Sequence, residues 1–165
     1  MKLLIAEDDD FFRRLLQQVL KSEFNLCVAR DGAEAWRLLQ SLTEPVLAIL
    51  DWVMPGMSGP QLCREARALP ETAGAYLILL TAKNSTADII AGLGSGADDY
   101  VTKPFQPEEL RARVRIGRRV LELQGEVAEQ RAALRESMTR ERLLQSQMQS
   151  LQAKSTPAAA KAASA

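Results

Sequence analysis

Short apolar runs alternate with amphipathic stretches along this chain. The run Val46–Leu50 is apolar throughout, as in a strand buried on both faces of a sheet, and it stops at Asp51. Pro55, Gly56 and Gly59 then break the chain into a turn before the next helix. Further apolar runs predict strands at 3–6, 24–29, 75–80 and 97–101. Apolar residues at helical spacing predict helices at 11–21, 33–42 and 59–69, a fourth from Asn84 or Ser85 to Ala91, and a fifth from Pro107.

Five strands that alternate with five helices predict an α/β protein. The simplest arrangement is a flavodoxin-like, doubly wound, five-stranded parallel sheet of order 2-1-3-4-5, followed by a long C-terminal α-helix. Gly92, Gly94 and Gly96 are expected to weaken and end the fourth helix. In this order the first and third strands are neighbours, and the strand order reverses between them. Ligands bind at that point in open α/β sheets.

Charged and hydroxyl side chains follow the predicted strands. Glu7 and Asp8 come directly after the first strand, and Asp51 comes after the third. Thr81 follows the fourth strand and Lys103 follows the fifth. Because the carboxyl ends of parallel strands meet at one edge of a sheet, we expect the three acids in one crevice, with the threonine and the lysine projecting beside them.

A simpler interpretation of these acids stays open. Asp9 or Asp10 can cap the helix that follows, and Asp51 can cap a turn, since aspartate is common at both kinds of position. The acidic run from Glu7 to Asp10 is longer than a cap requires, however. Four consecutive acids also repel one another unless a cation lies among them.

Three clustered carboxylates are typical of a magnesium site, because Mg²⁺ prefers a few carboxylate oxygens and retains several waters. Lys103 would add a point charge for a phosphate, and Thr81 a hydrogen-bond donor. Such a cradle suits phosphoryl transfer, which depends on positioning and charge neutralisation. The candidate nucleophile is the carboxylate of Asp51, which would form an acyl phosphate.

The composition of the chain excludes several kinds of functional site. The chain has no histidine, which excludes histidine-based triads, histidine-ligated metals and a phosphohistidine of its own. No apolar run approaches the roughly 18 residues of a membrane span, and the N-terminus begins a strand without a signal peptide. Cys27 and Cys63 lie in apolar stretches, as free thiols of a cytoplasmic protein do. Residues 1–106 carry 10 basic and 14 acidic side chains, whereas residues 107–154 carry 10 and 7, so an acidic domain precedes a basic extension.

Residues 1–120 resemble the receiver domain of bacterial two-component response regulators, including those of chemotaxis. The resemblance rests on five segments that occur in order, each at a predicted strand end. They are Glu7-Asp8, the segment DWVMPGMSG from Asp51 to Gly59, Leu80-Thr81-Ala82, GADDY from Gly96 to Tyr100, and VTKPF from Val101 to Phe105. Each segment alone is weak evidence, and the ordered set is strong.

The resemblance implies a phosphoacceptor and a metal. Asp51 would accept a phosphoryl group from a histidine kinase or a phosphotransfer protein. Glu7 and Asp8 would bind Mg²⁺ together with Asp51 and the backbone carbonyl of Val53. The protein would therefore not be an enzyme, beyond self-phosphorylation from small donors and slow autodephosphorylation.

The resemblance also implies how the phosphorylated state is held and read. Lys103 and Thr81 would hold the phosphoryl group, and Thr81 and Tyr100 would act as a switch in which the tyrosine turns inward as the threonine moves. The peptide between Lys103 and Pro104 would be cis. Val53 cannot hydrogen-bond an attacking water, and Lys83 is long and flexible, so slow loss of the phosphoryl group is expected.

A heptad pattern extends from residue 116 to residue 151, and eight of its eleven a and d positions are apolar. Valine at a with leucine at d favours a parallel two-stranded coiled coil, in which Glu126 of one chain can reach Arg131 of the other. Gly117 and Gly125 each lower helix propensity by about 1 kcal/mol. Positions a are Val120, Val127, Leu134, Glu141 and Met148, and positions d are Ile116, Leu123, Gln130, Ser137, Leu144 and Leu151.

The predicted organisation is a receiver domain at 1–120, a fifth helix that continues as a coiled-coil stalk at 107–152, and a disordered Ala-rich tail at 153–165. The stalk would make a parallel homodimer through residues 116–151. It resembles the linkers that join receivers to cyclic-dinucleotide synthase or phosphatase domains. Arg111, Arg115 and Arg118 share one helix face, but no nucleic-acid-binding motif accompanies them, so a solvated or partner-facing surface is favoured.

The sequence thus predicts a response regulator that is phosphorylated on Asp51 and signals through a dimeric helical stalk to an output domain or partner. Two alternatives stay open. One is a coiled-coil scaffold that binds its partner regardless of phosphorylation. The other is an aspartate-nucleophile phosphohydrolase of the haloacid dehalogenase type, which needs a second acid where this chain has Val53.

Overall fold

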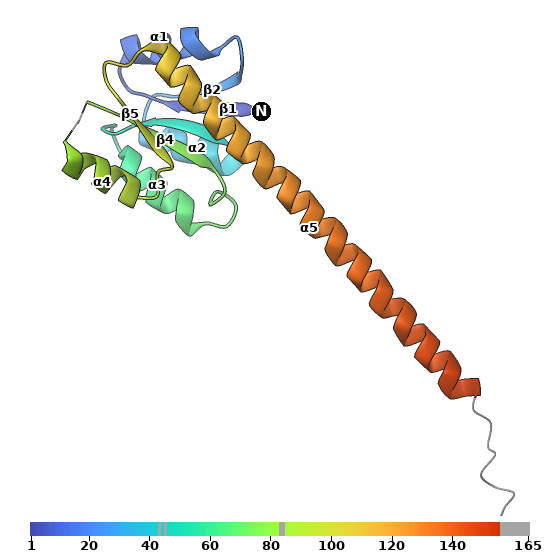
Figure 1. Ribbon diagram of the computed structural model, residues 1–165. Coiled ribbons are helices and arrows are strands. Elements are labelled where there is room, and N and C mark those ends of the chain that lie inside the picture. Colours follow the sequence, from blue (N-terminus) through green and yellow to red (C-terminus); the bar gives the residue numbers. More distant parts are fainter. Residues whose placement is uncertain (43, 45, 83–84, 156–165) are drawn as a thin grey trace, which may run out of the picture. The chain divides into compact units, whose positions relative to one another are not determined.

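The computed structural model describes residues 1–42, 44, 46–82 and 85–155. Strands and helices alternate along the chain (Figure 1). The predictions made for Asn84, Lys83 and the tail beyond Ser155 lie outside the described residues. The strands are β1 (Lys2–Ala6), β2 (Asn25–Ala29), β3 (Leu47–Asp51), β4 (Tyr76–Thr81) and β5 (Asp99–Thr102). The helices are α1 (Asp10–Leu20), α2 (Gly32–Ser41), α3 (Gly59–Ala68), α4 (Thr86–Gly94) and α5 (Pro107–Ser155).

The five strands form one parallel sheet of order β2-β1-β3-β4-β5, which confirms the predicted fold. β1 and β3 are neighbours, with Ala6 opposite Leu50. The strand order therefore reverses between these two strands. The residues that follow β1, β3, β4 and β5 leave the sheet at the same edge, which is what the clustering of the predicted site requires.

Side chains alternate between two hydrophobic cores, one on each face of the sheet. In β1, Leu3 and Ile5 join the core that also contains buried residues of α1 and α5, whereas Leu4 and Ala6 join the core with α2 and α3. Figure 1 shows α1 and the first part of α5 on one side of the sheet, and α2 and α3 on the other. Every residue of β3 and β4 is buried, because both faces of these central strands are covered.

The fourth helix is longer than predicted. α4 starts after its cap Ser85, which accepts from the backbone N–H of Asp88, but it continues past Ala91 to Gly94. Gly92 lies inside this helix because of packing: a Cβ there would be 2.7 Å from Trp52 and 3.3 Å from Leu79. The turn that follows uses Gly96, whose φ of +97° favours glycine. The predicted end at Ala91 was therefore three residues too early, because a close contact with Trp52 places glycine at position 92, and the helix ends at Gly94 within the predicted glycine segment.

Contacts divide the chain into two compact units, Met1–Gln124 and Gly125–Ala165. The first contains the sheet and the beginning of α5, where Leu110, Val114 and Leu121 are buried. A Cβ at Gly117 would lie 2.5 Å from the ring of Tyr76, so this glycine lets α5 approach β4. Helix α5 continues to Ser155, three residues beyond the predicted 152.

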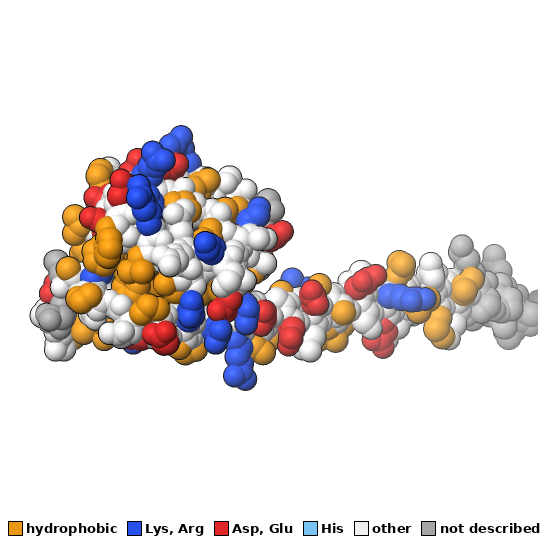
Figure 2. Space-filling model, turned by 90° about the horizontal axis from the view of Figure 1, so that it is seen from above, with side chains coloured by type: hydrophobic (Ala, Val, Ile, Leu, Met, Phe, Trp, Pro, Cys, Tyr) orange, Lys and Arg blue, Asp and Glu red, His pale blue; other side chains and the backbone are white. Residues whose placement is uncertain are grey.

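The described part of the second unit is helical, and its residues 126–152 are exposed. Hydrophobic side chains are interspersed with charged ones on its surface (Figure 2). Seven predicted seam residues are at least 45% exposed: Ile116, Leu123, Val127, Leu134, Leu144, Met148 and Leu151, of which the first two belong to the first unit. Val120 differs, since it is half-buried against the core of the first unit. In the described part of the chain, no helix has the length and apolar character needed to cross a membrane.

Candidate phosphoacceptor and metal site

The acidic run after β1 divides into a cap and a pair of site residues. Asp9 caps α1, because its carboxylate accepts from the backbone N–H groups of Phe11 at 2.8 Å and Phe12 at 3.0 Å. Glu7 is fully buried, whereas Asp8 is exposed. The simple capping interpretation is therefore correct for Asp9, and it leaves Glu7 and Asp8 available for the site.

Asp51 ends β3 and is only 7% exposed. The chain turns directly after it: the N–H of Trp52 donates to the carbonyl of Leu80, and the N–H of Gly59 donates to the carbonyl of Trp52 at 3.1 Å. Only glycine fits at position 59, since a Cβ there would lie 2.4 Å from the Asp51 carbonyl oxygen. Ser58 and Gln61 form a capping box that starts α3 at this point. The turn thus keeps the Asp51 side chain at the edge of the sheet.

Lys103 joins the acids from β5. Its Nζ lies 2.8 Å from Oε2 of Glu7 and 2.9 Å from Oδ1 of Asp51, and its side chain is 10% exposed. The ammonium also lies 4.5 Å from the ring centroid of Phe12, and the Lys103 N–H donates to the carbonyl of Thr81 at 2.7 Å. The peptide between Lys103 and Pro104 is cis, as predicted. One cation is therefore shared between two buried carboxylates.

Glu7, Asp8 and Asp51 form a group whose nearest carboxylate oxygens all lie within 4.8 Å of one another. Oε2 of Glu7 is buried and, apart from its ion pair with Lys103, makes no hydrogen bond within the described chain. Three convergent carboxylates, one of them exposed, fit a small hard cation that keeps part of its water shell. The donor set therefore suits Mg²⁺.

Two opposing effects set the pKa values of the two buried carboxyls in the cluster: their burial and their ion pairs with Lys103. Burial raises the pKa of the Glu7 carboxyl, against the effect of the neighbouring ammonium, and the charge of Asp51 raises it further. Burial also raises the pKa of Asp51, although Lys103 opposes the increase. Burial by itself would lower the pKa of Lys103, but its two carboxylate partners outweigh burial and raise it. The lysine is thus held charged, while the acids favour an additional positive charge.

The remaining predicted residues lie around this cluster. Thr81 ends β4, is 2% exposed, and lies opposite Thr102 of β5. Tyr100 lies on β5 opposite Leu79 and packs half-buried against the core that contains α2 and α3. Val53 lies in the turn after β3 and is 67% exposed. The structure thus brings Glu7, Asp8, Asp51 and Lys103 together, and it sets Thr81 and Tyr100 on the two adjacent strands.

Arg13 is a residue that the sequence analysis did not identify. Its Nη1 donates to the backbone carbonyls of Glu7 and Asp8, each at 3.0 Å, and its Nη2 pairs with Asp10. Its guanidinium thus holds the loop that carries two of the three clustered carboxylates. The spacing of Asp10 and Arg13 indicates an ion pair on a helix. Nothing in the sequence indicates that the same guanidinium reaches back to the loop.

The arginines of α5 that share one face have partners in the first unit. Nε of Arg111 donates to the carbonyl of Val19 at 3.2 Å, and Arg115 makes two hydrogen bonds to Glu23, each 3.0 Å long. Arg118 pairs with Glu122 at 3.7 Å. Part of the charge on this face is therefore used in contacts within the first unit.

Comparison with known proteins gives a consistent result. The family model described as "Response regulator receiver domain" matches residues 3–115. The DNA-binding response regulator MtrA of Mycolicibacterium smegmatis is 44% identical over 115 residues, which cover 69% of this chain and 49% of that protein. The receiver domain of Francisella response regulator 1452 superposes with a TM-score of 0.66 at 33% identity, covering 74% of this chain and 98% of that one.

A third similar structure is the receiver domain of a sensor histidine kinase from Pseudomonas aeruginosa, which has a magnesium ion coordinated in its active-site cleft. It has a TM-score of 0.63 and 26% identity, and the match covers 70% of this chain and 95% of that one. The present chain spans about half the length of the curated relatives that it matches.

Proposed function

Because the chain belongs to the family of response regulator receiver domains, we propose that Asp51 is its phosphoacceptor and takes a phosphoryl group from a histidine kinase or a phosphotransfer protein. One observation carries the proposal: Oδ1 of Asp51 lies 2.9 Å from Nζ of Lys103, inside a cluster of three carboxylates at the edge of the sheet. A nucleophile, a fixed cation and a metal-binding set therefore converge.

Each residue has a defined part in the transfer. A carboxylate oxygen of Asp51 attacks phosphorus, the phosphorus–nitrogen bond of the donor phosphohistidine breaks, and the imidazole leaves with the bonding electrons. Lys103 neutralises charge on the transferred group, and the Thr81 hydroxyl at the end of β4 donates a hydrogen bond to it. Glu7, Asp8, Asp51 and the Val53 carbonyl hold Mg²⁺, which neutralises phosphoryl charge when it is bound.

The same geometry supports a phosphorylation switch. Thr81 lies two residues beyond Leu79, the β4 residue opposite Tyr100, so a shift of the threonine toward a phosphoryl group changes the space next to the tyrosine. Tyr100 is half-buried and can turn further inward. The protein is proposed to act as a phosphoacceptor and not as an enzyme, with slow loss of its phosphoryl group, because Val53 offers no side chain that orients water.

Intact-mass measurement tests the phosphoacceptor. We expect the wild-type protein to gain one phosphoryl group when it is incubated with acetyl phosphate and Mg²⁺, and the Asp51→Asn variant to gain none. Asp31→Asn is a matched control, because Asp31 caps α2 away from the acidic cluster. Equal phosphorylation of the Asp51→Asn and wild-type proteins would show that another residue is the acceptor.

The second part of the proposal is a parallel homodimer through residues 116–151. It is supported by seven exposed apolar seam residues, which a second helix would cover. Val120 packs against the receiver core, so the seam is expected to be strongest from Leu123 onward. Light scattering tests the dimer: the full chain is expected to be dimeric before phosphorylation, and a chain ending at residue 115 monomeric. A monomeric full chain at tens of micromolar would exclude the stalk dimer and leave the phosphoacceptor unaffected.

The output is proposed to be a further domain or a separate partner protein, since the chain spans only about half of its curated relatives. A phosphohydrolase is less well supported, because Val53 occupies the position of the second acid. Binding of the output partner equally well to the Asp51→Ala and phosphorylated proteins would instead support a scaffold.

A further inference from the structure

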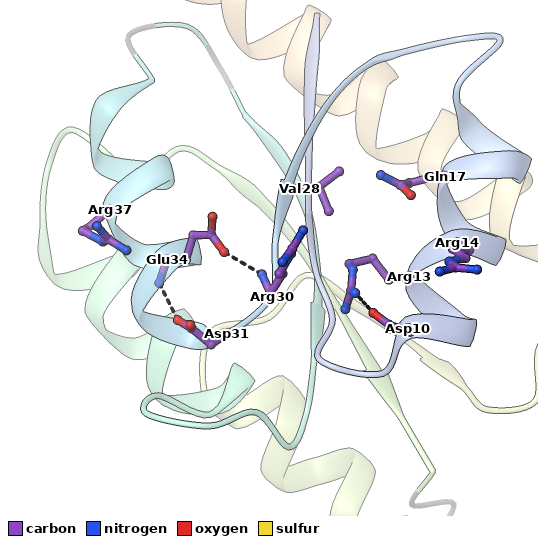
Figure 3. A pocket seen from close by; sticks show the side chains of 9 residues that line it. All are labelled: Asp10, Arg13, Arg14, Gln17, Val28, Arg30, Asp31, Glu34 and Arg37. Carbon is purple, nitrogen blue, oxygen red and sulfur yellow. Dashed lines mark hydrogen bonds and ion pairs between the residues drawn. The ribbon is translucent and has the colours of Figure 1, made fainter.

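A polar cleft lies between α1 and α2 beside the end of β2, separate from the acidic cluster. Its volume is about 780 Å³. Figure 3 shows Arg13 and Arg30 near its middle, with Arg14 on the α1 side and Arg37 on the α2 side. Its other lining residues are Asp10, Gln17, Val28, Asp31 and Glu34. Four arginines from two helices and one loop therefore line one cleft, with Arg14 and Arg37 at opposite ends of it.

Three of these guanidinium groups are available to a ligand. The side chains of Arg14, Arg30 and Arg37 are exposed, and none makes a hydrogen bond or ion pair with another described residue. Arg13 differs, because it is bound to Asp10 and to the loop after β1. Unpaired arginines from separate elements that line one cleft form a surface on which planar oxyanions can be bound in a bidentate manner.

The acids in the cleft form no ion pair with Arg14, Arg30 or Arg37 within the described chain. Asp10 pairs with Arg13. Oδ1 of Asp31 accepts from the backbone N–H of Glu34 at 2.7 Å, and Oε2 of Glu34 accepts from the backbone N–H of Arg30 at 2.8 Å. Each acid thus has a local partner that does not involve a free guanidinium. They keep their negative charge, so a bound oxyanion would be held mainly by the three guanidinium groups that have no acidic partner.

The lining defines the class of ligand. Val28 is its one apolar residue and no aromatic side chain is present, so the cleft offers no stacking surface for a nucleobase and little apolar area for a hydrophobic ligand. Its volume is that of a small-molecule site. We propose that the cleft between α1 and α2 binds a small molecule with two or more oxyanion groups, held by Arg14, Arg30 and Arg37. Phosphate and carboxylate groups share this chemistry.

Isothermal titration calorimetry in magnesium-free buffer tests the site, with inorganic pyrophosphate and citrate as probes. We expect the wild-type protein to bind at least one of them, and the Arg14→Gln/Arg37→Gln variant to bind it at least about tenfold more weakly, as expected for the loss of one or more charge-assisted hydrogen bonds. Binding of pyrophosphate alone would indicate a phosphorylated ligand, and binding of citrate alone a polycarboxylate. Binding of both would indicate a general oxyanion site.

Two control variants separate this site from other causes. Arg64→Gln/Arg119→Gln removes the same charge at exposed positions outside the cleft and is expected to bind like the wild type. Asp51→Asn is expected to bind equally well, which makes the result independent of the proposed phosphoacceptor. The inference is overturned if neither probe binds at millimolar concentration. It is also overturned if the Arg14→Gln/Arg37→Gln variant binds like the wild type while its melting temperature shows that it is folded. The third contrary outcome is that Arg64→Gln/Arg119→Gln lowers the affinity as much as Arg14→Gln/Arg37→Gln does.

Discussion

Replacement of Lys103 by methionine tests whether one buried cation holds the acidic cluster together. Methionine keeps most of the side-chain volume and removes the charge. In the metal-free protein, Glu7 and Asp51 then lose an ammonium 2.8 Å and 2.9 Å away, respectively. Both carboxylates are buried and their pKa values are already raised, so the loss of Lys103 is expected to destabilise the fold substantially at neutral pH.

The magnitude follows from two opposing effects. At an effective dielectric constant of about 20, each contact contributes roughly 6 kcal/mol of Coulomb attraction. Desolvation of the ions removes most of that gain, and deletion of one member of a buried ion pair typically costs about 3–5 kcal/mol. Because Asp8 leaves one side of the cluster open to solvent, we expect the lower end, about 3 kcal/mol in the free energy of unfolding.

The expected pH dependence has a definite sign. A carboxyl whose pKa is higher in the folded than in the unfolded protein binds more protons when folded, so acidification removes an unfavourable charge from the fold. The stability deficit of Lys103→Met should therefore be largest at neutral pH. It should shrink as the pH falls through the raised pKa values of Glu7 and Asp51, toward their ordinary values near pH ~4.

Urea unfolding followed by circular dichroism measures these effects. In a Glu7→Gln background, Lys103→Met should lower the free energy of unfolding by about half as much, since one of the two partners of Lys103 is already neutral. Lys2→Met, at an exposed position of β1, serves as the control. A deficit below about 1 kcal/mol, or an equal deficit in both backgrounds, would refute the view that Lys103 stabilises the cluster through its charge.

Two further changes test the metal site and the packing of α5. Mg²⁺ at ten times its Kd should raise the free energy of unfolding of the wild-type protein by about 1.4 kcal/mol through mass action, which is observed as a higher melting temperature. Asp8→Leu should abolish this response, and an equal response in the variant would contradict the proposed ligands. Gly117→Ala should lower the free energy of unfolding in urea by about 1–3 kcal/mol, because its Cβ would meet the Tyr76 ring. Gly125→Ala, which has open space around it, should instead increase helicity. Similar effects at both positions would argue against a tight α5–β4 contact.

Much of the fold and the candidate site could be predicted from local patterns. The apolar runs of β3 and β4 are continuous because both faces of the central strands are buried, so their position in the sheet is evident from the sequence. Once the strand order is inferred, the residues after each strand must meet at one edge. Glu7, Asp8, Asp51 and Lys103 were placed together on that basis, and the structure brings them together.

Features that depend on contacts between distant elements could not be predicted. From the sequence, Gly92 and Gly117 are expected only to lower helix propensity. In the structure, the space that a Cβ would need at these positions is occupied by Trp52 and Tyr76, which lie far away in the sequence. Val120 fits the heptad pattern, yet it packs against the receiver core. A pattern along one helix indicates that a face is apolar, and it does not identify what covers that face.

The sequence by itself determined the order of the strands, the edge at which the charged residues meet, and the chemistry available there, because these follow from periodicity and residue type. Only the tertiary structure decided that Lys103 pairs with two acids at once, that Arg13 holds the loop of Glu7 and Asp8, and that Arg14, Arg30 and Arg37 line one cleft. The physical reason is the length of these side chains. A lysine or an arginine spans several ångströms, and its partner is therefore set by the three-dimensional packing of the elements around it.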